Sequence, residues 1–288
     1  MTSAATVRSF GSAFDRVASD YDRRRPAYPD EIVERACAAA GLRSGDRVLE
    51  LGCGSGQLTR ALLARGLRVT AVEPGASLVA LARGKLAGEG ELELINARFE
   101  DAPAMRERFA AVFCASAFHW IDPDVSWRKA ADSLAHGGTL ALIQHFGLQE
   151  RHSLSDQQAL LAAIARVAPE IAAAWPTYWD LSTILAEGAR RRGNVSEVWS
   201  WLGRYELARA CAGRLFGEVE IAVTPLRGEH TAAELNALMA TTSIYARLSA
   251  RQRGALERET DELHRRLGRP IRSSTAAVAV TARRTALR

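Results

Sequence analysis

The stretch Glu50-Leu51-Gly52-Cys53-Gly54-Ser55-Gly56 decides how this chain is expected to fold. A short apolar run, residues 47–49, precedes it, and leucines at helical spacing follow it over residues 58–66. The glycines are therefore expected to form the turn between a strand and a helix. Glycine adopts backbone conformations closed to other residues, and the N–H groups at a helix start are free to face a ligand. The pattern predicts a binding site at this turn.

A second acidic residue stands at the end of the next predicted strand. Residues 67–72 read as that strand, Glu73 ends it, and the pair Pro74-Gly75 breaks it. A carboxylate in this place can accept hydrogen bonds from both hydroxyls of a ribose. The dinucleotide fingerprint Gly-x-Gly-x-x-Gly requires a glycine where Gln57 stands. The pattern therefore predicts a nucleoside site and disfavours a nicotinamide oxidoreductase.

These two motifs resemble those of the class I S-adenosylmethionine-dependent methyltransferases. The first motif of that family reads acidic-x-Gly-x-Gly-x-Gly, and an acidic residue ends its second strand. The resemblance implies that S-adenosylmethionine is the cofactor, with Glu50 near its ammonium group and Glu73 on its ribose. The predicted cofactor-binding residues are Glu50, Gly52, Gly54, Gly56, Glu73, Pro74, Phe99, Glu100, Ser116 and Tyr21.

Residues 96–103 resemble the loop that surrounds the adenine in this family. An aromatic or apolar face packs against the base there, and an acid or a carbonyl accepts a hydrogen bond from its N6 amino group. The resemblance assigns these contacts to Phe99 and Glu100, with Asp101 as the reserve acid. A plain surface turn is the alternative interpretation.

Two further segments resemble the branch of the family that contains the trans-aconitate methyltransferases. Phe118-His119-Trp120 follows the predicted strand 109–115, and Tyr21-x-x-x-Arg25-Pro26 precedes the first strand. The resemblance implies a lid in which Tyr21 covers the sulfonium and Arg25 holds a carboxylate. His119 is either a general base, since an unperturbed histidine has a pKa of about 6.5, or a lining of the cofactor pocket. His119 and Tyr21 are the predicted catalytic residues.

Aromatic residues are concentrated after the predicted core, among them Trp175, Tyr178, Trp179, Trp199 and Trp201. Aromatics at helical spacing commonly pack in a core, but an aromatic-lined hollow suits planar or apolar acceptors. The predicted substrate-binding residues are Arg25, Trp120, His145, Trp175, Trp179 and Tyr245.

Alternating strands and helices predict an α/β fold, with a Rossmann-like, seven-stranded, mostly parallel sheet, an antiparallel last strand and a helical cap. The strands are expected at 47–51, 67–72, 91–96, 109–115, 138–145, 218–226 and 275–283. We expect four segments: a lid segment (1–30), a Rossmann-like cofactor-binding core (31–146), a helical substrate-cap insert (147–214) and C-terminal strands and helices that complete the sheet (215–288).

The composition narrows the function classes. A net charge of +5 fits an anionic substrate, but the scattered arginines disfavour nucleic acid as the partner. Four distant cysteines and dispersed acids predict neither a disulfide nor a metal site. With no apolar run of about 20 residues and no signal-like start, we expect no membrane span and a cytoplasmic location. Monomer and homodimer both remain open.

Together these observations predict an enzyme that moves a methyl group from S-adenosylmethionine to an oxygen or nitrogen atom of a small organic acceptor. Secondary metabolism is one setting left open. Two alternatives remain: an RNA methyltransferase and a non-catalytic protein that binds S-adenosylmethionine. The Asn/Asp-Pro-Pro-Tyr/Phe motif of base-amino methylation is absent after residues 109–115, which disfavours the first.

Overall fold

Apolar strands that alternate with helices build a seven-stranded sheet in the order β3-β2-β1-β4-β5-β7-β6. The computed structural model describes residues 27–173, 175, 178–242, 245 and 247–285. Strands β1 to β5 pair in parallel, and β7 lies antiparallel between β5 and β6. The predicted Rossmann-like sheet is therefore confirmed. The strands are β1 (Arg47–Leu51), β2 (Arg68–Glu73), β3 (Leu92–Asn96), β4 (Phe109–Ala115), β5 (Leu134–Gly147), β6 (Phe216–His230) and β7 (Ile271–Arg284).

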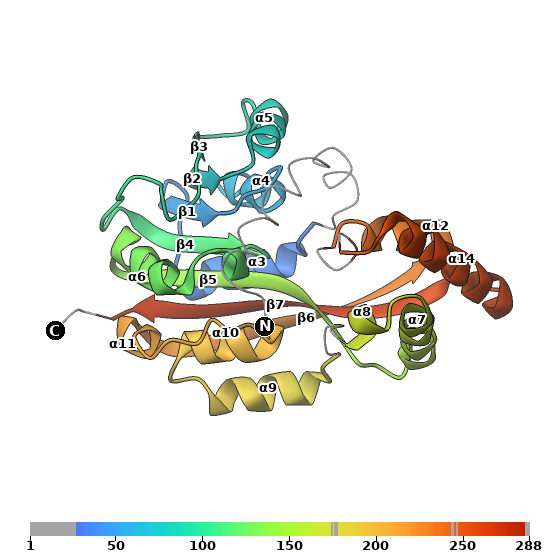
Figure 1. Ribbon diagram of the computed structural model, residues 1–288. Helices are drawn as coiled ribbons and strands as arrows, with labels where there is room; N and C mark the ends of the chain where they lie inside the picture. The colour runs from blue at the N-terminus through green and yellow to red at the C-terminus, as the bar shows by residue number, and fades with distance from the viewer. Residues whose placement is uncertain (1–26, 174, 176–177, 243–244, 246, 286–288) are drawn as a thin grey trace.

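Helices cover both faces of this sheet, so its central strands are buried on both sides (Figure 1). Successive side chains of a strand point to opposite faces. In β1, Val48 joins one hydrophobic cluster, whereas Leu49 and Leu51 join the other. The helices up to β5 are α3 (Asp30–Ala40), α4 (Gln57–Leu63), α5 (Ala76–Lys85), the short 3-10 helix η1 (Phe118–Trp120) and α6 (Pro123–Ser133).

The strand register brings the predicted site residues to one edge. Leu51 of β1 lies opposite Val72 of β2 and Cys114 of β4. Glu73, the last residue of β2, lies opposite Asn96, the last residue of β3. The carboxyl ends of these parallel strands therefore meet, and this is the edge where ligands bind in open α/β sheets.

The segment 147–214 is helical, as its periodicity predicts, but its helices go to two places. Helices α9, α10 and α11 run along one side of β6 and β7, whereas α7 and α8 lie with α12 and α14 beyond the other end of these strands (Figure 1). Helices that precede β6 in the sequence (α7 and α8) and helices that follow it (α12 and α14) therefore lie together beyond the carboxyl end of β5 (Figure 1). The helices are α7 (Leu154–Val167), α8 (Pro169–Ala173), α9 (Leu181–Arg190), α10 (Val195–Gly203), α11 (Ala212–Leu215), α12 (Ala232–Met239) and α14 (Ala250–Leu267).

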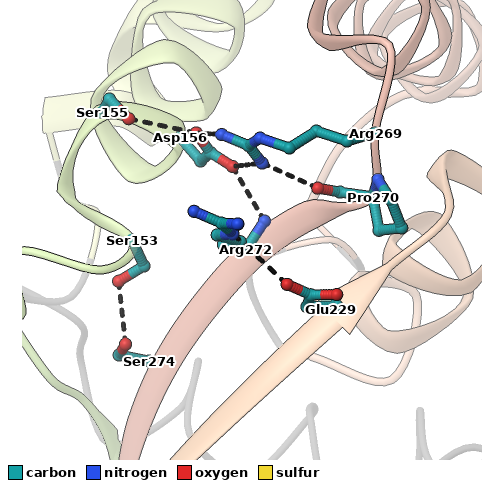
Figure 2. Close-up of polar contacts among 8 residues, drawn as sticks. All are labelled: Ser153, Ser155, Asp156, Glu229, Arg269, Pro270, Arg272 and Ser274. Atoms are coloured by element: carbon teal, nitrogen blue, oxygen red, sulfur yellow. Dashed lines mark hydrogen bonds and ion pairs between the residues drawn. The ribbon is translucent and has the colours of Figure 1, made fainter.

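A buried carboxylate ties α7 to the start of β7. Asp156 is 1% exposed and accepts hydrogen bonds from Nη1 and Nη2 of Arg269, at 2.7 and 2.9 Å, and from the backbone N–H of Arg272, at 2.8 Å. Ser153 donates to Ser274 beside it, at 2.9 Å. Figure 2 shows both contacts between the helix and the strand. Helix α7 is therefore fixed to the sheet by polar contacts as well as by packing.

Two features are absent from the described ranges: a helix that could span a membrane and a cluster of metal-binding side chains. Each helix found there is too short or too polar to cross a bilayer. Within the same residues, no three or more His, Cys, Asp or Glu side chains are arranged to hold a metal ion.

Candidate functional site

The glycine turn between β1 and α4 adopts the conformation that its sequence predicts. Gly52, Gly54 and Gly56 have φ values of 68°, 57° and 94°, in the region that L side chains rarely adopt. A Cβ atom on Gly52 would lie 2.4 Å from Cβ of Ala117, which follows β4. The turn thus lies directly against the segment that carries η1, and Gly52 allows this approach.

Glu73 joins the two sequence motifs. It is 6% exposed, and its Oε2 accepts from the N–H of Gly54 at 3.0 Å while its Oε1 accepts from the N–H of Gly75 at 2.9 Å. Each carboxylate oxygen can accept a further hydrogen bond, so these contacts orient the group without exhausting it. The arrangement suits a ligand with two neighbouring hydroxyls.

Asn96 was not among the predicted site residues, although it supports Glu73. Its Nδ2 donates to the carbonyl oxygens of Glu73, at 2.9 Å, and Pro74, at 3.1 Å. The predicted residue Pro74 is exposed at the end of β2. Its position at the end of the strand next to β2 is the sequence feature from which this contact could have been predicted.

Glu50 lies beneath the glycine turn. It is 1% exposed, and Oγ1 of Thr59 donates to its Oε2 at 2.7 Å. Burial raises the pKa of this carboxyl to about 7; the Thr59 hydrogen bond lowers it, and the charge of Glu73 raises it further. Contact between Glu50 and an ammonium group stays a prediction. Cys53 is also buried, and burial raises the pKa of its thiol, which suits the predicted role of a small filler.

The raised pKa of Glu50 predicts how stability depends on pH. A carboxyl with a pKa of about 7 when folded, against 4.5 for a glutamate in water, holds a proton that the unfolded chain releases. The stability it contributes is therefore present below pH 4.5 and is lost as the pH rises through 7. Glu50→Gln keeps an acceptor for Thr59 and cannot ionise. We expect its free energy of unfolding at pH 8 to be up to about 3 kcal/mol higher than that of the wild type.

Urea unfolding of both proteins at pH 5 and pH 8, without ligand, measures this difference. Other titrating groups contribute equally to the two proteins, so the comparison isolates Glu50. Parallel pH dependence in the wild type and Glu50→Gln would show that Glu50 is ionised throughout.

The predicted adenine loop follows β3 at the same edge. Phe99 is only 4% exposed and packs in the larger core cluster, so its ring lies beneath the loop. Glu100 is half-buried, and its Oε1 accepts from Nη2 of Arg98 at 2.6 Å and from the N–H of Asp122 at 3.1 Å. Asp101, the reserve acid, is exposed. The loop is therefore an ordered turn that hydrogen bonds hold in place, and its contacts to a base remain predictions.

Ser116 and His145 are brought together through Tyr28. Ser116 has φ of 55°, and its Oγ lies 2.8 Å from Oη of Tyr28. The Tyr28 ring stacks on His145, with 5.0 Å between ring centroids and 10° between ring planes. Tyr28 was not a predicted site residue, although it belongs to the Tyr-x-x-x-Arg-Pro-x-Tyr-Pro segment.

His119 lies between two aromatic rings. It stacks on Tyr205 at 4.6 Å and 8°, and it contacts Trp120 at 4.6 Å and 47°. Oη of Tyr205 accepts from Nε2 of Gln144 at 2.6 Å. Gln144 precedes His145 on β5, so the two stacks lie on opposite faces of that strand. Tyr205 follows α10, and only its place in the aromatic-rich segment could have signalled it.

The remaining predicted substrate residues lie at or beyond the carboxyl end of β5, where Trp179 pairs with Leu148. Trp179 packs on Trp201, at 4.4 Å and 32°, and donates to the carbonyl of Leu202. Trp175 and Tyr245 pack among the apolar residues of α7, α8, α12 and α14. Large rings bury much apolar area, which explains why they serve helix packing here. Tyr21 and Arg25 lie outside the described residues.

Comparison with known proteins agrees with this geometry. Residues 49–142 match the family model described as a methyltransferase domain. An uncharacterized methyltransferase of Mycobacterium tuberculosis is 36% identical over 135 residues, which are 47% of this chain and 51% of that protein. The chain thus spans about half the length of the first curated relatives it matches.

Two further similarities concern a shorter stretch of sequence and the overall fold. The ribosomal RNA small subunit methyltransferase A of Magnetococcus marinus is 46% identical over 71 residues, 25% of this chain and 24% of that protein. The solved structure of a putative type II methyltransferase from Anaeromyxobacter dehalogenans superposes with a TM-score of 0.58 at 21% identity, over 90% of this chain and 97% of that one. Residues 49–142 are therefore similar to a methyltransferase domain, and the solved structure has the same fold. The glycine turn and Glu73 fit S-adenosylmethionine as the cofactor of that domain.

Proposed function

We propose that this protein transfers a methyl group from S-adenosylmethionine to an oxygen or nitrogen atom of a small organic acceptor. One observation carries the proposal: Glu73 is a buried carboxylate that the N–H groups of Gly54 and Gly75 hold at the carboxyl end of β2. In this geometry, a carboxylate that can accept hydrogen bonds from ribose hydroxyls lies beside a glycine turn, and a ligand can approach the backbone of that turn.

The described residues fit the cofactor in charge as well as in shape. S-adenosylmethionine carries one net positive charge, and two buried acids, Glu50 and Glu73, lie at the turn. Gly52, where a Cβ would clash, keeps the turn against Ala117 and thus against the edge that carries His119. A dinucleotide would bring two anionic phosphates to the turn, which these acids disfavour.

The chemistry needs little from the protein beyond alignment. When bound, S-adenosylmethionine supplies a methyl group already activated by its sulfonium. The chain's residues then orient the acceptor and exclude water. His119, held by Tyr205, stands at the edge where it can accept a proton from a hydroxyl or amine acceptor. A carboxylate acceptor is already ionised at neutral pH and needs no base.

Two features favour a small acceptor over RNA: the segment after β4 and the helices beyond the carboxyl end of β5. The Phe118-His119-Trp120 run resembles the trans-aconitate methyltransferase branch, and we propose membership of that small-molecule group. Helices α7, α8, α12 and α14 pack at the carboxyl end of β5, where a cap over a small acceptor belongs. The ribosomal RNA methyltransferase match covers only 25% of this chain and 24% of that protein, so it carries no argument about the acceptor.

Replacing Glu73 tests the proposed cofactor site. Glu73→Ala removes the acceptor of the ribose hydroxyls, so we expect S-adenosylhomocysteine to bind about 10- to 100-fold more weakly, the loss of roughly 1.5–3 kcal/mol from a charge-assisted hydrogen bond. Isothermal titration calorimetry measures this change. The matched control is Glu93→Ala, an exposed acid of β3 that accepts from Thr70. Equal affinity in Glu73→Ala and Glu93→Ala would refute the ribose assignment.

A further inference from the structure

A short turn at the end of α10 folds the Tyr205 ring back over Gly203. A Cβ atom at Gly203 would lie 1.9 Å from Cε2 of Tyr205 and 2.3 Å from its Cζ, so any side chain here would displace the ring. Arg204, between them, has a φ of 52°, in the left-handed region that residues other than glycine rarely adopt. The N–H of Tyr205 donates to the carbonyl of Ser200 at 2.9 Å and closes the turn. The backbone therefore adopts an unfavourable conformation in order to place one ring.

The ring placed in this way lies face to face with His119. The two ring centroids are 4.6 Å apart, and the ring planes differ by 8°. Nε2 of Gln144 on β5 donates to Oη of Tyr205 at 2.6 Å and holds the far end of the phenol. The Tyr205 ring is thus fixed by the turn and by β5, and it presents one face to the imidazole.

The neighbours of His119 fix where it stands relative to the glycine turn. Phe118 is fully buried and packs on Trp127, with 4.5 Å between the ring centroids. Ala117 lies against Gly52 of the glycine turn. These contacts anchor the backbone of η1, whereas the half-buried ring of His119 is oriented by the aromatic rings that it touches.

An aromatic face can stabilise the charge that a histidine acquires during catalysis. The face of an aromatic ring is electron-rich and attracts a cation. A general base becomes a cation when it accepts the proton of its substrate. The Tyr205 ring can therefore fix the plane of the imidazole and stabilise the imidazolium. Neither effect helps an acceptor that has no proton to lose.

We propose that Gly203 and Tyr205 position His119 as a general base, and that the acceptor is a hydroxyl or an amine that loses a proton rather than a carboxylate. The inference rests on the proposed function, because it names the acceptor class of the same site. A histidine that only lined the pocket would need no fixed plane, whereas a base must direct one ring nitrogen at the acceptor. Tyr205 acts through His119 and is a positioning residue.

The proposed step is balanced in atoms and charge. The acceptor oxygen or nitrogen forms a bond to the methyl carbon, and the carbon–sulfur bond breaks with its electron pair on sulfur. The acceptor proton passes to a ring nitrogen of His119, which later releases it to solvent. The positive charge thus moves from the sulfonium to the imidazole, beside the Tyr205 face.

The test is transfer of a labelled methyl group from S-adenosylmethionine to two panels of small acceptors. One panel contains phenols, alcohols and primary amines, and the other contains carboxylates without hydroxyl or amino groups. We expect the full-length wild type to transfer label to the first panel. Tyr205→Leu, which removes the ring, should lower kcat on these acceptors by about 10- to 100-fold. It should leave the affinity for S-adenosylhomocysteine unchanged.

Two matched variants separate the ring from its hydroxyl and from the fold. Tyr205→Phe keeps the ring face and removes only the hydroxyl, so it should retain most of the turnover. Gly203→Ala keeps every side chain around His119 but displaces the ring, so it should reproduce the loss in Tyr205→Leu. Its control is Gly193→Ala, because a Cβ atom there meets no atom within 4 Å. Gly203→Ala also serves as the second variant if Tyr205→Leu does not fold.

A double mutant connects Tyr205 to the base. Adding Tyr205→Leu to His119→Ala should lower kcat little further, since both changes act through one group. A ring that merely supported the fold would lower the turnover of the wild type and of His119→Ala by the same factor.

The outcomes separate the two claims. A wild type that does not bind S-adenosylhomocysteine, or that transfers label to neither panel, refutes the proposed function. Transfer to carboxylates alone overturns the acceptor class and leaves the methyltransferase intact. Equal losses from Tyr205→Leu with and without His119, or a fall in cofactor affinity with unchanged kcat, overturns the role of Tyr205.

Discussion

Gly52→Ala is expected to weaken binding of S-adenosylhomocysteine by more than about tenfold and to lower the free energy of unfolding by about 2–4 kcal/mol. Two costs add at this position. The φ of 68° is unfavourable for alanine, and the new Cβ would lie 2.4 Å from Cβ of Ala117. Relief of that clash must move the glycine turn away from the segment after β4, so the ligand site and the fold are damaged together.

Gly41→Ala is the matched control for this substitution. Gly41 ends α3 with φ of 64°, and a Cβ there would meet no atom within 4 Å. It should cost only the backbone term, about 1–2 kcal/mol, and leave the affinity unchanged. Urea unfolding and calorimetric titration of both variants measure the two effects. If Gly52→Ala matched Gly41→Ala in stability and in affinity, the close approach to Ala117 would not constrain the site.

Asp156→Ala is expected to lower the free energy of unfolding by about 2–4 kcal/mol, because it leaves the Arg269 guanidinium and the N–H of Arg272 without their acceptor. The change removes the polar anchor between α7 and β7 that Figure 2 shows. Thermal unfolding of the purified protein, followed by circular dichroism, measures it. Glu229→Ala is the control, because Glu229 pairs with Arg272 at an exposed position and should contribute less than about 1 kcal/mol.

The Asp156 anchor should also weaken in acid. Burial alone would raise the pKa of this carboxyl, but hydrogen bonds from Arg269, the N–H of Arg272 and Ser155 together lower it. A lowered pKa means that the folded state holds fewer protons than the unfolded state, so the contribution is present at neutral pH and is lost as the pH falls. The stability difference between the wild type and Asp156→Ala should therefore shrink below the unfolded pKa of an aspartate. A constant difference from pH 7 to pH 3 would contradict the ion pair.

The parts of the fold that follow from local patterns could be predicted. The glycine turn and Glu73 depend on residues adjacent in sequence, and the alternation of strands and helices fixes the parallel core. The lengths of the later strands could not be predicted in the same way. The expected strand 138–145 is β5, Leu134–Gly147, because its pairing with β7 continues past the parallel core. That pairing joins residues more than 120 positions apart.

In the candidate site, too, the residues placed by local sequence patterns could be predicted, whereas those placed by tertiary packing could not. Glu50, Gly52 and Glu73 lie together as expected, since each lies at or just after the carboxyl end of a strand at one edge. Tyr205 could not be predicted, because the segment after α10 reaches His119 only through tertiary packing. Trp175, Trp179 and Tyr245 show the converse. Their density left core packing and a pocket open, and in the structure they pack against other apolar and aromatic side chains, so contact with an acceptor stays a prediction.

The measurement that tests the central claim most directly is transfer of a labelled methyl group. The full chain is incubated with S-adenosylmethionine labelled in its methyl group, together with either a panel of small carboxylates, phenols and amines or total RNA. We predict stoichiometric formation of S-adenosylhomocysteine and label in a small organic product, with both reduced in Gly52→Ala at a cofactor concentration that does not saturate the variant. Label recovered only in RNA would contradict the small-acceptor claim, and binding of S-adenosylmethionine without any transfer would contradict the enzyme itself.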